Sequence, residues 1–183
     1  MILRFHHPSD DHGHGSPAEV VREPGRPRLT MLLSYGGWQD QSFAHQLPRL
    51  LGPMGIQCVW AGSADDATRV IRSMAVHIAV VDLAIPMTPM TPGSPGAARP
   101  DTDTRPAPAG PRVLQLLRRL EQPPPTVVVR PPQWSHRDSA RTLADALRDG
   151  AFAVLDRPVP LEAMLEVLRR IVRRHYKDHW PAA

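Results

Sequence analysis

Five short runs of apolar residues, each followed by a segment long enough for a helix, most constrain how this chain can fold. Runs rich in Val, Ile and Leu, without polar alternation, are typical of strands buried on both faces of a parallel sheet. Parallel neighbours need a crossover of a dozen or more residues, which the intervening segments supply. The expected strands are 29–34, 56–60, 77–82, 126–129 and 152–155.

The intervening segments carry apolar residues at helical spacing. Ser63 and Asp66 form a capping-box pattern, Pro111 suits a first helical turn, Gly150 suits a helix end, and Pro48 is expected to kink the first helix. The expected apolar stripes are Phe43, Leu47, Leu50, Leu51 and Met54; Val70, Ile71 and Met74; Val113, Leu114, Leu117 and Leu120; Leu143, Ala144 and Leu147; and Leu161, Met164, Leu165, Leu168, Ile171 and Val172. Five strands alternating with five helices predict an α/β fold, a doubly wound parallel sheet covered on both faces.

Low-complexity segments divide the 183 residues. Residues 1–28 are expected to form a flexible arm, 29–175 one domain, and 176–183 a tail. The proline-rich stretch 87–110 is expected to be a loop insertion, because its prolines prevent a regular helix or central strand. Since no output domain follows the last helix, we expect a stand-alone module that docks on another protein or pairs with itself.

Composition excludes several classes of protein. One cysteine, Cys58, leaves no internal disulfide, and no apolar run approaches the ~20 residues that cross a bilayer. We therefore expect a soluble, cytoplasmic protein without a membrane role. The formal charge of +4 comes almost entirely from arginine, which indicates a composition bias rather than a nucleic-acid partner.

The stretch "HIAVVDLAIPM", His77 to Met87, places one carboxylate, Asp82, at the end of an apolar run. Asp82 either begins a turn or belongs to a site, since open α/β sheets bind ligands at the carboxyl ends of their strands. The other residues at this edge are Ser34, Arg130 and the pair Asp156–Arg157. Their positions favour a site at Asp82.

Two stretches, "VVDLAIP" and "FAVLDRPVPLEAMLEVLRRI", resemble the receiver domains of bacterial response regulators. The resemblance implies a flavodoxin-like sheet of order 2-1-3-4-5 and an aspartate, here Asp82, that accepts a phosphoryl group from a histidine kinase. Pro86 matches the family's proline four residues after that aspartate. Arg157 and Pro158 match its Lys-Pro dipeptide, which implies a cis bond between them.

The residues around Asp82 depart from the family's pattern. Ser34 and Tyr35 stand where the family has a pair of acids that hold Mg²⁺, and Asp40 is only a weak replacement. Arg130 replaces the hydroxyl residue that ends the fourth strand, and an arginine also replaces the family's lysine. No metal ligand set is therefore assigned.

We therefore expect a degenerate receiver, not an enzyme, that needs no cofactor and acts through protein contacts. Asp82 is expected to pair with Arg130, Arg157 or both. The expected partner is a histidine kinase or another signalling protein, and a homodimer stays open.

Two alternatives remain. One is a phospho-accepting receiver that uses Asp82 and Mg²⁺ in an acidic site rebuilt around Asp40. The other is a flavodoxin-like binder of a small ligand at the turn "SYGGWQD". Outside the domain, His6, His7, His12 and His14 either bind a metal or belong to a solvated tail, and Trp134 and Trp180 either anchor a partner or cover the edge of the core.

Overall fold

The computed structural model describes residues 29–34, 43–88, 108–132 and 136–177. The expected arm, most of the insertion and most of the tail lie outside these residues, as do Tyr35 and Asp40. Within the described ranges, no helix is both long enough and apolar enough to cross a membrane.

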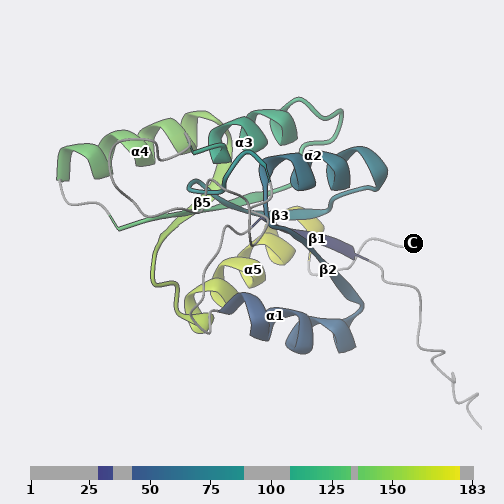
Figure 1. Cartoon of the computed structure of the whole chain (residues 1–183). Helices are drawn as coiled ribbons and strands as arrows, with labels where there is room; N and C mark the ends of the chain where they lie inside the picture. The colour runs from purple at the N-terminus through teal and green to yellow at the C-terminus, as the bar shows by residue number, and fades with distance from the viewer. Residues whose placement is uncertain (1–28, 35–42, 89–107, 133–135, 178–183) are drawn as a thin grey trace, which may run out of the picture.

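A parallel five-stranded sheet forms the centre of the molecule (Figure 1). Its order, β2-β1-β3-β4-β5, confirms the predicted fold class. The strand bounds are Leu29–Ser34 (β1), Ile56–Ala61 (β2), Ile78–Asp82 (β3), Thr126–Arg130 (β4) and Ala151–Asp156 (β5), within two residues of the predicted ones.

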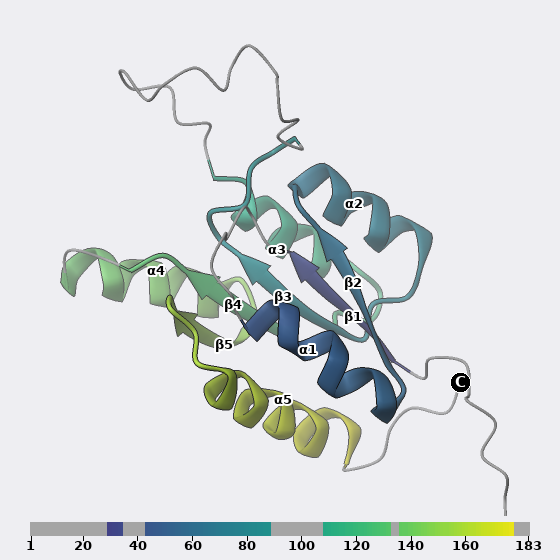
Figure 2. The same cartoon turned by 60° about the horizontal axis from the view of Figure 1, so that its bottom comes forward.

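Helices cover both faces of the sheet. Figure 2 shows α1 and α5 on one face and α2, α3 and α4 on the other. Their bounds are Phe43–Leu51 (α1), Ala64–Ser73 (α2), Gly110–Arg118 (α3), His136–Arg148 (α4) and Leu161–Tyr176 (α5). Because the helices connect parallel strands, the carboxyl ends of all five strands lie at one edge of the sheet.

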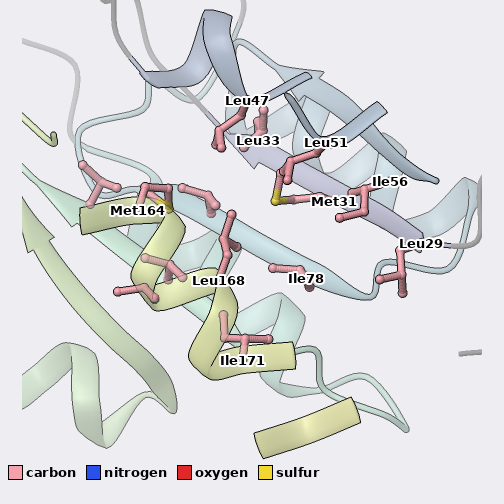
Figure 3. Packing of buried hydrophobic residues seen from close by; sticks show 14 of the residues in the cluster. Leu29, Met31, Leu33, Leu47, Leu51, Ile56, Ile78, Met164, Leu168 and Ile171 are labelled. Atoms are coloured by element: carbon pink, nitrogen blue, oxygen red, sulfur yellow. The ribbon is translucent and has the colours of Figure 1, made fainter. Parts of the chain in front are cut away.

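Strand alternation divides the core into two layers. Ile78 and Val80 of β3 pack with α1 and α5, whereas Ala79 and Val81 pack with α2 and α3. Every residue of β3 is therefore buried, which explains the apolar run from Ile78 to Val81 before Asp82. Figure 3 shows the layer between β1, β3, α1 and α5, with Met164, Leu168 and Ile171 of α5 directed at the sheet.

Local sequence signals set several helix ends. Ser63 caps α2 by accepting a hydrogen bond from the Asp66 backbone N–H at 3.1 Å, and its hydroxyl donates to the Asp66 carboxylate at 2.9 Å. Pro111 lies in the first turn of α3. Gly150 adopts a φ of +90° directly after α4, where a side chain would be strained.

Three predicted stripes need correction. Met54 lies in a separate 3-10 turn, Gly52–Met54, because Gly52 and Pro53 end the α-helix after Leu51. Met74 caps α2 in an extended conformation and is exposed. Among the α4 side chains that the structure describes, Ala146 is buried, whereas Leu143, Ala144 and Leu147 are exposed. Ala146 is one position, or about 100°, from Leu147 around the helix, so the helix presents a different face from the predicted one.

The amino ends of β1 and β3 and the end of α5 meet at His77. The Thr30 backbone N–H donates to His77 Nδ1 at 3.0 Å, and the His77 N–H donates to the Thr30 carbonyl at 2.9 Å. The Tyr176 hydroxyl donates to the His77 carbonyl at 2.6 Å. Burial of the half-buried Tyr176 ring raises the pKa of its phenol.

Replacement of the Tyr176 hydroxyl tests this junction. Tyr176→Phe is expected to lower the free energy of unfolding by about 1 kcal/mol, because the His77 carbonyl loses a partner while the ring packing is kept. Urea denaturation of both proteins measures the difference. An unchanged midpoint would show that the hydrogen bond adds no stability.

Candidate functional site: a buried aspartate and two arginines

Asp82 ends β3 with its side chain fully buried. By strand alternation the carboxylate lies on the face of Ile78 and Val80, the face covered by α1 and α5. One carboxylate oxygen, Oδ1, accepts the Ala84 backbone N–H at 2.9 Å, and the Asp82 carbonyl accepts the Ile85 N–H at 3.2 Å. Asp82 therefore both ends the strand and shapes the turn after it.

Arg157 supplies the countercharge. It follows β5, its backbone N–H donates to the Arg130 carbonyl at 3.0 Å, and its peptide bond to Pro158 is cis, as the resemblance to receiver domains implies. The Nη2 atom of its guanidinium pairs with Asp82 Oδ2, and 23% of its side chain is exposed. Because a buried carboxylate is costly unless it is paired, this contact compensates the charge of Asp82.

Arg130 lies in a different cluster. It ends β4, is 5% exposed, and donates to Asp156 at the end of β5 and to Ser139 in α4. Its Nη1 donates to the Ser139 carbonyl at 2.6 Å, and its Nη2 donates to the Ser139 hydroxyl at 2.8 Å and to Asp156 Oδ2 at 3.2 Å. Asp156 Oδ1 accepts from Nε in a second contact of the same ion pair.

Strand alternation explains why the two arginines separate. Arg130 shares a face with Val128, which packs with Leu114 of α3 and Ala146 of α4. Asp82 lies on the opposite face of the sheet. Of the pairings that the sequence left open, the structure has the one with Arg157, whereas the Arg130 guanidinium binds Ser139 and Asp156.

The remaining predicted residues have separate positions. Ser34 ends β1, is 1% exposed, and shares a face with Leu32 and Val81; its hydroxyl has no hydrogen-bond partner among the described residues. The Pro86 carbonyl accepts the Ala64 N–H at 2.8 Å, which fixes the turn after Asp82 to the start of α2. Pro158 is exposed.

Gly110 is a residue that sequence reasoning missed. It begins α3 against the backbone of the turn after β3, and a Cβ there would lie 2.4 Å from Leu83 Cα and 2.5 Å from the Asp82 carbonyl oxygen. Only glycine fits this close approach. A glycine next to Pro111 at the start of a helix was the available signal.

The residues described around Asp82 do not fit a magnesium ion. Magnesium takes oxygen ligands, and among the described residues a guanidinium is paired with the Asp82 carboxylate. In the parts of the chain that the structure describes, no three His, Cys, Asp or Glu side chains are grouped so that they could hold a metal.

Removal of Arg157 tests the ion pair. Arg157→Met is expected to destabilise the protein by about 3 kcal/mol, because the buried Asp82 charge loses its compensation. Asp82→Asn combined with Arg157→Met is expected to cost less than the sum of the two single changes, with a coupling energy of at least about 1 kcal/mol from urea denaturation. A coupling energy near zero contradicts the pairing.

Removal of Arg130 tests the second cluster. Arg130→Met is expected to speed amide hydrogen exchange in the first turns of α4 by at least about tenfold, because Ser139 loses both hydrogen bonds to the guanidinium. Arg141→Met is the matched control, since Arg141 lies in the same helix with 85% of its side chain exposed. Equal exchange in both variants would show that Arg130 does not hold α4.

Comparisons with known proteins bear on the fold. No protein-family model matches the chain, and no curated protein matches it. Solved structures do match it, and several are receiver domains of response regulators.

Three examples show the extent of the match. A two-component response regulator from Clostridium difficile is 18% identical, with a TM-score of 0.56, over 80% of this chain and 98% of the other. A CheY-like receiver domain protein from Methanospirillum hungatei JF-1 is 17% identical, with a TM-score of 0.56, over 82% and 98%. The receiver domain of the Francisella response regulator 1452 is 16% identical, with a TM-score of 0.54, over 80% and 98%. The chain therefore has the fold of a response-regulator receiver domain.

Proposed function

We propose that this chain is a receiver-like signalling module of the two-component or phosphorelay type that works without phosphorylation and acts through protein contacts. The observation that carries the proposal is the ion pair between the buried Asp82 carboxylate and the Arg157 guanidinium. The receiver fold supports the assignment to signalling modules, and the ion pair at Asp82 supports action without phosphorylation.

The ion pair opposes phosphorylation in two ways. A phosphoryl group has to approach a carboxylate oxygen, and Asp82 Oδ1 and Oδ2 are held by the Ala84 N–H and by Arg157. Attack of the carboxylate on a phosphoryl group also requires a cation that neutralises the phosphoryl oxygens. A guanidinium in contact with the carboxylate repels such a cation. Separating the pair would leave a fully buried carboxylate uncompensated.

The cluster around Arg130 supports a fixed output surface. Arg130 joins α4, through Ser139, to the end of β5, through Asp156. Arg157 then joins the loop between β5 and α5 to Asp82. The face formed by α4, β5 and α5 is thus held in one arrangement by two arginines rather than by a phosphoryl group.

The same face carries the apolar surface that a protein partner needs. Leu143 and Leu147 of α4 are 39% and 50% exposed, and the side chains of β5 are half-buried along most of the strand. Exposed apolar residues that lie together are typical of protein-binding surfaces. A histidine kinase or another signalling protein is the expected partner, and a second copy of this chain would use the same surface.

Titration with magnesium and beryllofluoride, which mimics a phosphoryl group on aspartate, tests the proposal. The amide NMR signals of residues 79–88 and 151–160 are expected to show no saturable shift, because Arg157 holds the carboxylate. Asp82→Asn is the matched control and should respond like the parent protein.

Two outcomes would contradict the proposal. A saturable, magnesium-dependent shift that is lost in Asp82→Asn would identify a phospho-accepting receiver. Large shifts with a nucleotide or flavin, unaffected by Asp82→Asn, would identify a small-ligand binder.

A further inference from the structure

An apolar pocket of about 230 Å³ opens between α1 and α5 at the end of the sheet where the strands begin. This is the end opposite Asp82. Figure 3 shows Met31, Leu51, Ile56, Ile78 and Leu168 around this region. The full lining is Met31, Leu51, Met54, Ile56, Ile78, Leu165, Leu168, Arg169 and Val172, so eight of the nine residues are apolar.

The size and chemistry of the pocket fit one aromatic side chain. Pockets that hold a whole small ligand usually measure ~300–1,000 Å³, and this one is smaller. Arg169 is the one charged residue of the lining, and its side chain is 81% exposed. A guanidinium beside an apolar pocket favours the face of an indole above other aromatic rings.

The chain leaves α5 next to this pocket. Val172, which lines the pocket, lies one helical turn before Tyr176, whose hydroxyl bonds the His77 carbonyl. His77 is the neighbour of Ile78, another lining residue. Lys177 then adopts a left-handed conformation with a φ of +50°, its N–H bonded to the Val172 carbonyl, and ends the helix.

Trp180 is close enough along the chain to reach the pocket. Trp180 is four positions beyond Tyr176, a distance of at most about 14 Å when the chain is extended, whereas Val172 lies only about 6 Å back along the helix from Tyr176. Phe5 of the amino-terminal segment is 24 residues from Leu29, so docking it closes a much longer loop, at a greater entropic cost, than docking Trp180, which is three positions from Lys177. The segment after α5 is therefore the favoured occupant within the chain.

We propose that the segment after Lys177 docks back on the domain, with the indole of Trp180 in the pocket and against the guanidinium of Arg169. Residues 178–183 lie outside the described part of the chain. Asp178 adds charge complementarity, because the exposed residues near the end of α5 include Arg173 and Arg174. The proposal is independent of phosphorylation and of the contacts of Asp82.

Tryptophan quenching in the full chain tests the proposal. With Trp38, Trp60 and Trp134 replaced by Phe, Trp180 is the only indole. Its acrylamide quenching constant is expected to be at most about a third of that of N-acetyltryptophanamide, because the docked ring is covered. Met54→Glu should raise the constant towards the free value, since Met54 lines the pocket, whereas Leu50→Glu should leave it unchanged. Met54 and Leu50 are similarly exposed, at 53% and 47%, so the two variants are matched.

A second measurement keeps the result independent of the tryptophan replacements. The dye ANS is expected to bind Trp180→Ala more strongly than the parent, because the pocket is then open. A Trp180 quenching constant equal to that of N-acetyltryptophanamide, or equal ANS binding by Trp180→Ala and the parent protein, overturns the proposal. Two other results would also overturn it. In the first, ANS binding rises when residues 1–28 are removed but not in Trp180→Ala. In the second, protection of Trp180 from acrylamide grows with protein concentration, which would mean that a second copy covers the ring.

Discussion

The buried charge of Asp82 is the constraint on which the structure at the carboxyl ends of the strands depends. A carboxylate with no solvent exposure at the end of a central strand has to be compensated locally. One oxygen accepts the Ala84 N–H and the other pairs with Arg157, so the loops after β3 and β5 are fixed by the same side chain. The charge of Asp82 thereby holds the two loops together.

The alternation of the parallel strands divides the two arginines between the faces of the sheet. Arg157, in the loop after β5, reaches Asp82, whereas Arg130 projects to the face of α3 and α4 and binds Ser139 and Asp156. The two clusters are joined through the backbone, since the Arg157 N–H donates to the Arg130 carbonyl. A change at either arginine would therefore reach the α4–β5–α5 face.

The strands and the position of Asp82 could be predicted because they depend on sequence patterns that are local and strong. A strand buried on both faces is apolar along its length, and β3 is apolar from Ile78 to Val81, up to the carboxylate that ends it. The partners of Arg130 could not be predicted, because Asp156 lies beside it only when β5 pairs with β4, and Ser139 only when α4 packs on the sheet. The buried face of α4 was misassigned for a related reason. The residues Leu143, Ala144 and Leu147 have helical spacing, but the small Ala146 is the residue that packs with Val128 and Leu114. Gly110 was missed because its role is a backbone contact with Asp82 and Leu83, which leaves no periodic signal.

A crystal structure grown with magnesium and beryllofluoride tests the central claim most directly, because it locates the groups around Asp82. The account predicts that the Arg157 guanidinium stays on the Asp82 carboxylate and that neither the cation nor the fluoride binds there. A magnesium ion ligated by Asp82, with Arg157 displaced, would contradict it.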